Sequence, residues 1–187
     1  MRPEARETIE SCKLAGIRPI IVTGDHKLTA RTIGREVGLF KYGDKILQGT
    51  DIDRLSDENL KKEIKKTNIF ARVEPKHKIR IVDALQAQNE VVAMTGDGVN
   101  DAPAIKSADI GVALGSGSEV TKETADIVLL DDNFKTIVDA IKTGRNIFNN
   151  IKKIILFLLT DTFTEFILIG SALLMGFPLP LLASQIL

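Results

Sequence analysis

The sequence predicts an α/β fold, in which a parallel sheet carries helices on both faces and is followed by a transmembrane α-helix. Short apolar runs rich in β-branched residues alternate with helical segments through the charged part of the chain, a pattern typical of strands that pair in parallel. The tripeptide Thr-Gly-Asp follows two of these runs, at 23–25 and 95–97. Of the 25 basic and 25 acidic residues, those beyond residue 150 are only Lys152, Lys153, Asp161 and Glu165. A charged body is therefore joined to an apolar segment.

The first two elements can be placed from their boundary residues. A helix is expected over residues 3–15, because Pro3 suits a first helical turn and Gly16 suits a stop. Residues 17–22 form a short β-branched run that is broken at 23–25. Such a run followed by a Gly-containing turn predicts a buried strand.

The rest of the body continues this alternation. Residues 39–55 are expected to be irregular apart from a short strand at 46–47, and Ser56 is expected to cap the next helix. The remaining expected elements are helices over 27–37, 56–66, 76–88, 102–107 and 121–125, strands over 68–72, 91–94, 110–113 and 127–130, and a long helix from about Asn133. Because ligands bind at the carboxyl ends of parallel strands, both Thr-Gly-Asp tripeptides are expected at a ligand site.

The composition excludes several classes of protein. Neither part of the chain carries an excess of positive charge, so a nucleic-acid partner is not expected. The single cysteine, Cys12, rules out a disulfide scaffold, and 44% hydrophobic residues rule out a disordered acidic chain. No Cys/His cluster has zinc spacing, and no Ser/His/Asp order indicates a hydrolytic triad.

The densest motif is Thr-Gly-Asp-Gly-Val-Asn-Asp-Ala-Pro at 95–103, directly after an expected strand. Asp97 and Asp101 lie four residues apart, with Asn100 between them. Mg²⁺ prefers such oxygen ligands, usually one or two carboxylates with phosphate and water. The two glycines are expected to let the backbone turn sharply and approach a ligand closely. An ordinary Asp/Asn/Gly turn is the alternative, which the length of the motif and its strand–loop–helix context disfavour.

Two further segments suit a phosphoryl group. At 23–25 a hydroxyl and free backbone N–H groups follow a strand and precede a helix, where they can hold a phosphoryl oxygen. In Ala-Arg-Val-Glu-Pro-Lys-His-Lys at 71–78, a helix is expected to start at the proline, and Lys78 lies one turn in. A lysine there can neutralise a phosphate as a point charge. The alternative is that Lys76 and Lys78 are cations on a solvated face, while His77 is expected to be a surface or packing residue rather than a ligand.

The apolar segment has the length of a membrane span. Residues 154–175 would form a helix of about 33 Å, which matches a hydrocarbon core of about 30 Å. Lys152 and Lys153 precede it, as cytoplasmic flanking charges do. The sequence Gly-Phe-Pro-Leu-Pro at 176–180 is expected to break the helix, and another apolar run begins at 181–187. A buried core helix of a soluble protein is the alternative.

Taken together, the motifs at 23–25, 72–78 and 95–103 resemble the phosphorylation domain of P-type cation-transporting ATPases, which belong to the haloacid dehalogenase superfamily. The likeness continues through 108–113 and 115–117, then through 131–134 and 144–145 into the apolar segment, and it is closest to the type II pumps, which include calcium and sodium/potassium ATPases. It implies a Rossmann-like sheet and the cofactors Mg²⁺ and ATP.

The resemblance also implies a role for each matching residue. Thr23 with Gly24 resembles the group that binds the transferred phosphoryl oxygens, and Lys78 resembles the lysine that neutralises phosphate. Asp97 resembles the Mg²⁺ ligand. The residues that resemble supports of the metal and phosphate geometry are Asn100 and Asp101, and those that resemble positions near the nucleotide are Asp25 and Arg72.

The apolar segment resembles the fifth membrane helix of these pumps and the start of the sixth. Glu165 falls on a carboxylate that helps bind the transported cation, Thr162 stands where the family often has Asn, and Asp161 is an additional carboxylate. Asp161 and Glu165 lie four residues apart and so share a helix face; ionisable groups at membrane depth usually serve an ion path. The resemblance implies an integral membrane protein whose residues 1 to about 150 are cytoplasmic.

The family's reaction needs an Asp nucleophile in the sequence Asp-Lys-Thr-Gly-Thr, which this chain lacks; its Asp44-Lys45 pair is followed by Ile-Leu. The nucleotide-binding domain, the actuator domain, other membrane segments and the first strand of the sheet are missing with it. We therefore expect a fragment of an ATP-driven pump for a cation such as Ca²⁺, inactive by itself, with domains at 1–148, 149–176 and 177–187. The alternatives are a stand-alone phosphatase of the same superfamily and a non-catalytic, membrane-anchored module that binds Mg²⁺ and phosphate.

Overall fold

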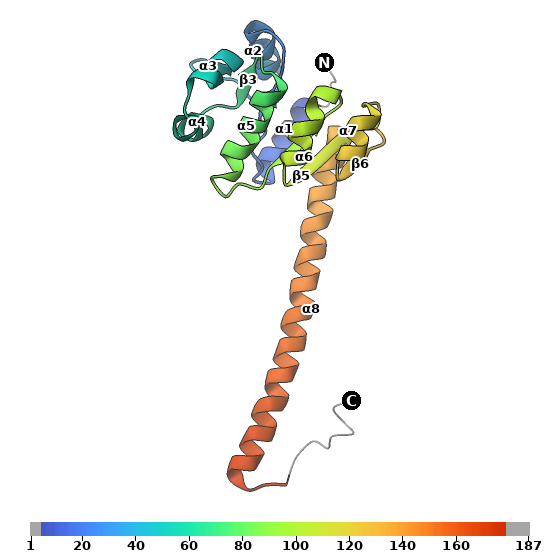
Figure 1. Ribbon diagram of the computed structural model, residues 1–187. Coiled ribbons are helices and arrows are strands. Elements are labelled where there is room, and N and C mark those ends of the chain that lie inside the picture. The colour runs from blue at the N-terminus through green and yellow to red at the C-terminus, as the bar shows by residue number, and fades with distance from the viewer. Residues whose placement is uncertain (1–4, 179–187) are drawn as a thin grey trace. The chain divides into compact units, whose positions relative to one another are not determined.

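The computed structural model describes residues 5–178 of the 187-residue chain, apart from the side chain of Phe134. The chain divides into two compact units, of which the first ends at Asp139 and the second begins at Ala140. Every strand of the described residues belongs to the first unit (Figure 1). Pro3, the predicted helix start, and the apolar run predicted over 181–187 lie outside the described residues.

The strands form two parallel sheets of three strands each. One sheet has the order β1-β3-β2 and the other has the order β4-β5-β6. The strands are β1 (Ile21–Val22), β2 (Ile46–Gln48), β3 (Ile69–Ala71), β4 (Ala93–Gly96), β5 (Ile110–Leu114) and β6 (Ile127–Leu129). The predicted α/β class and parallel pairing are confirmed, but the strands make two separate ladders in which β1 and β4 are edge strands.

Strand β1 is shorter than the predicted run over 17–22. Ile21 pairs with Ile69, the first residue of β3. Because β3 does not extend further in that direction, residues 17–20 have no β3 residue opposite them to continue the ladder. The apolar pattern therefore identified the strand correctly, and the length of the neighbouring strand decided where its ladder begins.

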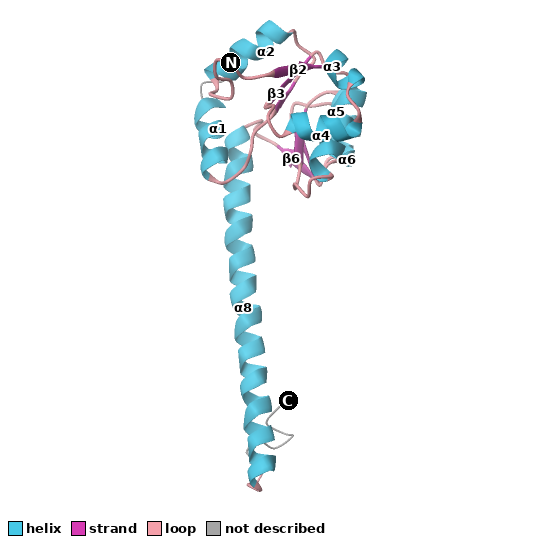
Figure 2. Ribbon diagram, turned by 90° about the vertical axis from the view of Figure 1, so that its left-hand side faces the viewer, coloured by secondary structure: helices cyan, strands magenta, loops and turns pink. Residues whose placement is uncertain are grey.

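Helices cover both faces of the first sheet, as predicted. Phe70, in the middle of β3, packs with residues of β2, α3, α4 and α5 in one buried cluster. Ile69 and Ala71 point to the opposite face and pack with Ala30 of α2 in another. Alternate residues of a strand point to opposite faces, so a strand buried on both sides needs this run of apolar residues. Figure 2 shows β2 and β3 side by side beneath α2.

Several helix boundaries follow the predicted caps. The helices of this unit are α1 (Ala5–Leu14), α2 (Lys27–Glu36), α3 (Gly49–Arg54), α4 (Asp57–Ile64), α5 (Pro75–Gln86), α6 (Ala102–Ser107) and α7 (Glu119–Thr124), with a 3₁₀ turn η1 (Val99–Asp101). Ser56 caps α4 as predicted, accepting a hydrogen bond from the Asn59 N–H at 3.4 Å. Gly16 and Gly38 follow α1 and α2 with φ values of +73° and +75°, a conformation that favours glycine.

Helix α3 is a correction, because residues 39–55 were expected to be irregular outside the strand at 46–47. The Gln48 N–H donates to the Asp51 carboxylate at 2.8 Å, which satisfies one of the donors that a helix start leaves without an intrahelical partner. Ile52 is fully buried and packs in the cluster around Phe70. One capping carboxylate and one buried residue therefore support a helix too short to show a clear periodicity in the sequence.

Helix α5 contacts elements of both sheet assemblies. It packs against α3 and α4, and also against η1 and α6 (Figure 1). Its Ile81 is buried in the cluster around Phe70, while the Gln86 side chain donates to the Ser107 carbonyl at 3.0 Å. The segment predicted to carry a phosphate-binding lysine is therefore also the link between the two ladders.

Helix α8 (Phe134–Met175) is uninterrupted over 42 residues, or about 63 Å. Within it, Lys135–Met175 is long and apolar enough to cross a membrane, with a mean hydropathy of 1.7 in its most apolar window. None of that window is buried within the described structure, unlike the core helix of a soluble protein. The helix ends before Gly176, whose φ is +71°, as predicted from the Gly-Phe-Pro break.

Candidate functional site

The predicted site residues follow the carboxyl ends of three parallel strands. Thr23 follows β1, Arg72 follows β3, and Asp97 follows β4. This is the edge at which α/β sheets bind ligands. The parallel pairing of the strands therefore places each of the separate motifs at the carboxyl end of a strand.

Lys78 and Asp101 meet in the structure. The Lys78 Nζ forms an ion pair with the Asp101 Oδ1, and the two side chains are only 14% and 12% exposed. Lys78 lies in the first turn of α5, and Asp101 ends the η1 turn. Charges that are shielded from water interact more strongly than surface charges. The alternative in which Lys78 is a cation on a solvated face is therefore wrong, whereas Lys76, with its side chain 60% exposed, does lie at the surface.

The Asp101 carboxylate is held by backbone as well as by Lys78. The Gly98 N–H donates to the Asp101 Oδ2 at 3.3 Å, and the Asp101 N–H donates to the Gly98 carbonyl at 2.8 Å. A Cβ at position 96 would lie 2.5 Å from the Asp101 Cβ. Gly96 is therefore required by the space that Asp101 occupies.

Neither glycine of this motif has a positive φ, so the expectation that both serve a sharp backbone turn is not met. Gly98 tolerates a side chain sterically, since its added Cβ would lie 3.7 Å from the nearest atom, the Asp101 Oδ2. The motif needs glycine at position 96 for close packing, and position 98 shows no comparable restriction.

Asp97 and Asn100 are exposed on this loop. The exposed Asp97 carboxylate and the Asp101 carboxylate four residues later are oxygen ligands of the type that Mg²⁺ takes, with phosphate and water completing its shell. Among the described residues, no group of three or more His, Cys, Asp or Glu side chains is arranged to hold a metal ion. The residues present fit a Mg²⁺ ion that is shared with a phosphate ligand rather than one caged by protein alone.

The other Thr-Gly-Asp loop is fastened to the loop after β3. The Arg72 N–H donates to the Asp25 carbonyl at 2.9 Å, and the Val73 N–H donates to the Thr23 carbonyl at 3.1 Å. The Thr23 Oγ1 accepts the Asp25 N–H at 3.1 Å. Gly24 lies between these contacts, with open space around most of its added Cβ. Thr23, Gly24, Asp25 and Arg72, singled out separately in the sequence, thus form one loop pair.

Arg72 has a φ of +48°, which is uncommon for a residue with a side chain. The hydrogen bond from its N–H to the Asp25 carbonyl holds the backbone there. Non-glycine residues in this region cluster at functional sites and cost on the order of 1 kcal/mol. The strained residue lies three positions before the start of α5 and hence close in sequence to Lys78.

His77 is a buried packing residue, which is one of the two roles predicted for it. It is 2% exposed. Its Nδ1 accepts the Glu74 N–H at 2.9 Å, so its ring proton lies on Nε2, which donates to the Asp53 Oδ1 at 3.0 Å. This hydrogen bond, followed by that of Lys76, lowers the pKa of Asp53 below its usual value. Asp53 was not singled out in the sequence, where nothing marks it as a partner of a histidine 24 residues away.

The contacts that Ser118 and Thr121 make with the 97–98 loop were not predicted from the sequence. The Ser118 N–H donates to the Asp97 carbonyl at 2.9 Å, and the Thr121 hydroxyl donates to the Gly98 carbonyl at 2.9 Å. Ser118 caps α7. The sequence signal was a Ser just before a helical segment, which favours an N-cap but does not predict the contact with the 97–98 loop.

The residues predicted to bind a transported cation lie on α8 in the second unit. Asp161 and Glu165 are spaced for one helix face, and the Thr162 hydroxyl donates to the Leu158 carbonyl at 3.0 Å. Hydroxyl groups inside apolar helices commonly donate a hydrogen bond to the carbonyl four residues earlier in the same helix. The three side chains belong to a single helix, whose sequence spacing therefore sets their arrangement.

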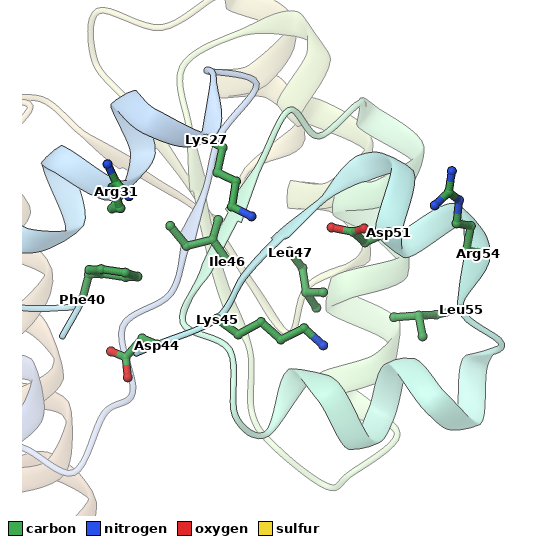
Figure 3. A pocket seen from close by; sticks show the side chains of 10 residues that line it. All are labelled: Lys27, Arg31, Phe40, Asp44, Lys45, Ile46, Leu47, Asp51, Arg54 and Leu55. Atoms are coloured by element: carbon green, nitrogen blue, oxygen red, sulfur yellow. The ribbon is translucent and has the colours of Figure 1, made fainter. Parts of the chain in front are cut away.

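A hollow of about 560 Å³ lies between α2, β2 and α3. Figure 3 shows Lys27 and Lys45 beside Ile46 and Leu47 of its wall. Lys45 is paired with Glu63, and Asp51 caps α3. None of the residues predicted to bind nucleotide, phosphate or Mg²⁺ lines this hollow.

Comparison with known proteins agrees with the motif resemblance. A model of the haloacid dehalogenase-like hydrolase family matches residues 1–109. Calcium-transporting ATPase 1 of Bacillus cereus is 50% identical over 187 residues, which are 100% of this chain and 21% of that protein. The calcium-transporting ATPase of Bacillus subtilis is 49% identical over the same shares, and the endoplasmic reticulum calcium ATPase srcA of Aspergillus fumigatus is 44% identical over 190 residues. The chain thus spans about a fifth of the length of these relatives.

Solved structures support the same relationship. A zinc-transporting PIB-type ATPase in its E2.Pi state aligns with a TM-score of 0.68 and 29% identity over 96% of this chain and 24% of that one. The catalytic domain of the CPx-ATPase CopB-B aligns with a TM-score of 0.57 and 27% identity over 75% of this chain and 45% of that one. The chain therefore belongs to the haloacid dehalogenase-like hydrolase family, and along its whole length it is similar to a segment of the calcium-transporting P-type ATPases.

Proposed function

We propose that this chain is the C-terminal part of the phosphorylation domain of an ATP-driven calcium pump, together with the pump's fifth membrane helix. The observation that carries the proposal is the shielded Lys78–Asp101 pair, whose Asp101 lies four residues after the exposed Asp97 in the segment that follows β4. The pump would transfer the terminal phosphoryl group of ATP to an Asp outside this chain. Phosphoryl transfer depends on positioning and charge neutralisation, and these residues provide both.

Each residue of the site would have a separate task. Asp97 would hold Mg²⁺, which when bound neutralises charge on the phosphoryl oxygens. Lys78 would neutralise another part of that charge, and Asp101 holds its ammonium group in place. Asn100 would support the metal and phosphate geometry beside them. The Thr23 hydroxyl, whose oxygen already accepts the Asp25 N–H, would donate its own proton to a phosphoryl oxygen next to the Gly24 backbone.

Nucleotide contact is assigned to the paired loops after β1 and β3. Asp25 and Arg72 are joined there through their backbones, so neither can shift without the other. The positive guanidinium of Arg72 suits a phosphate of ATP. The strained backbone at Arg72 supports this assignment, because such strain persists where a side chain must be aimed.

The second unit would carry the ion across the bilayer. Glu165, Thr162 and Asp161 are proposed as ligands of the transported cation, taken as Ca²⁺ from the names of the relatives. Lys152 and Lys153 would lie at the cytoplasmic end of the span. The proposed boundaries are residues 1–148 for the cytoplasmic part, 149–176 for stalk and membrane helix, and 177–187 for the loop and next helix.

The two separate ladders support the view that other parts of the pump complete this domain. Both β1 and β4 are edge strands, and the family resemblance implies a further strand that carries the Asp nucleophile. Exposed strand edges readily accept another strand. The pump's nucleotide-binding domain, actuator domain and other membrane segments are the remaining proposed partners.

A chimeric pump tests the proposal. The matching segment of the Bacillus subtilis calcium-transporting ATPase, 49% identical over 187 residues, is replaced by this chain, and acid-stable phosphoenzyme is measured with labelled ATP. We expect Ca²⁺- and Mg²⁺-dependent phosphoenzyme from the chimera and none from its Asp97→Ala variant. Asp97 is exposed, so this variant should fold normally.

The matched control is Lys76→Ala, which changes an exposed lysine two residues from Lys78 and should leave phosphoenzyme formation intact. A chimera that inserts into the membrane and unfolds cooperatively on heating but forms no phosphoenzyme would refute the proposal. Normal phosphoenzyme in Asp97→Ala would refute the role given to that carboxylate. Label retained on the 187-residue chain alone would favour a stand-alone enzyme instead.

A further inference from the structure

The start of α7 is attached to the loop that bears Asp97. Two successive carbonyls of that loop, those of Asp97 and Gly98, accept hydrogen bonds from the Ser118 N–H and from the Thr121 hydroxyl, each at 2.9 Å. Thr121 is fully buried. Two bonds on adjacent peptide units prevent the loop from rotating about the bonds that set the direction of the Asp97 side chain.

The hydrogen bonds around Thr121 have a defined direction. The Gly98 carbonyl can only accept, so the single hydroxyl proton of Thr121 points to it. The Ser118 and Thr121 oxygens lie 2.6 Å apart, and the Ser118 hydroxyl must therefore donate to Thr121. The Thr121 N–H in turn donates to the Ser118 Oγ at 3.2 Å. The chain of donors leaves no alternative orientation for the Thr121 hydroxyl.

The packing around this contact is also close. A Cβ at Gly117 would lie 3.1 Å from the Asp97 carbonyl oxygen and 3.2 Å from its Cα. Among the described residues, no buried side-chain nitrogen or oxygen lacks a hydrogen-bond partner. Removing the Thr121 hydroxyl would leave the Gly98 carbonyl with the Asp101 N–H as its remaining donor and would take away the acceptor of the Ser118 hydroxyl. The loss of hydrogen bonds at a buried contact is unfavourable, so the loop would be held less firmly.

We propose that Thr121 is a positioning residue for the Mg²⁺ step: its buried hydroxyl, oriented by Ser118, fixes the Gly98 carbonyl of the loop so that the Asp97 carboxylate is presented to the cation. The inference rests on the proposed function, since it assumes that Asp97 holds Mg²⁺. It adds a residue in another helix, α7, that touches neither metal nor phosphate. Outer-shell groups of this kind typically change metal affinity by about ten- to a hundredfold.

The test uses Thr121→Val in the chimeric pump, because valine keeps the branched shape and removes the donor. The matched control is Thr124→Val on the same helix, where the hydroxyl donates only to the Val120 carbonyl of its own helix. Thr121→Ser restores the hydroxyl. Thr121→Ala removes it without β-branching and suits a helix, which guards against a folding defect specific to valine.

Two measurements are made on each variant: the Mg²⁺ concentration for half-maximal phosphoenzyme, and the midpoint of Mn²⁺ binding by electron paramagnetic resonance with inorganic phosphate present and without ATP. We expect both midpoints to rise about tenfold or more in Thr121→Val and Thr121→Ala, and to remain at the parental value in Thr121→Ser and Thr124→Val. Unchanged midpoints with a lowered unfolding temperature would mean a structural role only and would overturn the inference.

The two proposals fail in different ways. A folded chimera without phosphoenzyme contradicts the pump function, whatever the Mn²⁺ midpoints. Normal phosphoenzyme in the chimera with unchanged Mg²⁺ and Mn²⁺ midpoints in Thr121→Val contradicts the role of Thr121 alone. Equal shifts in Thr121→Val and Thr124→Val would also overturn it, because only one of these hydroxyls reaches the loop.

Discussion

The Lys78 Nζ is paired with the Asp101 Oδ1, and neither side chain is more than 14% exposed. The two residues belong to different elements, α5 and η1. Their pairing also explains why the Asp101 carboxylate can occupy a nearly buried position, since a charge out of water needs a partner. The pair therefore links α5, which packs on the first sheet, to the η1 turn, which follows β4.

Breaking this pair from one side should be more damaging than changing both partners. Lys78→Met leaves the Asp101 carboxylate shielded and uncompensated, which we expect to destabilise the fold by about 3 kcal/mol. The double variant Lys78→Met/Asp101→Asn should be less destabilised, because the amide is neutral and its oxygen still accepts the Gly98 N–H. Calorimetric unfolding of the chimeric pump measures both. A double variant that is destabilised as much as Lys78→Met, or more, would show that the residues are not coupled.

The two glycines of the 95–103 motif should respond differently to alanine. At Gly96 the added Cβ would lie 2.5 Å from the Asp101 Cβ, whereas at Gly98 it would lie 3.7 Å from the nearest atom. We expect Gly96→Ala to destabilise by about 1–3 kcal/mol, as overpacking does, and to abolish phosphoenzyme. Gly98→Ala should unfold at nearly the parental temperature. Equal behaviour of the two variants would contradict the packing described for Asp101.

The Asp53–His77 hydrogen bond predicts an acid-dependent contribution to stability. The hydrogen bond from His77 lowers the folded-state pKa of Asp53, so the contribution is complete above the unfolded pKa of about 3.9. It is lost as the pH falls through the lowered folded pKa. Asp53→Asn should remove this pH dependence. The difference in the free energy of unfolding between the parent and this variant should therefore become smaller below about pH 4. A constant difference over that range, measured by unfolding at several pH values, would argue against the coupling.

Glu165→Gln should affect the ion step rather than the phosphoryl step. If Glu165 is a ligand of the transported cation, removing its charge should weaken Ca²⁺-dependent phosphorylation from ATP more than phosphorylation from inorganic phosphate. Glu165 lies on α8, in a different unit from the Lys78–Asp101 pair. Measuring both reactions in the chimera separates the two, and an equal loss of both would indicate a folding defect.

Most local structure was predictable because it depends on residues close together in the chain. Ser56 as a cap, Gly16 and Gly38 as helix stops, and the break after Met175 follow from side-chain and backbone preferences at single positions. The long motif at 95–103 carried the family relationship, which the comparisons confirm. Helix α3 was missed because its support comes from Asp51 as a cap and from the burial of Ile52.

The sequence by itself determined the alternation of strands and helices, the motifs that follow β1, β3 and β4, and the apolar length of α8, because each depends on short spacings. Tertiary structure alone decided that Lys78 is shielded by Asp101 rather than solvated, that His77 is buried against Asp53, that the strands form two ladders, and that Thr121 holds the loop of Asp97. The three side-chain contacts join residues 23 or 24 positions apart, and they exist only once α5 and α7 have packed against the rest of the fold.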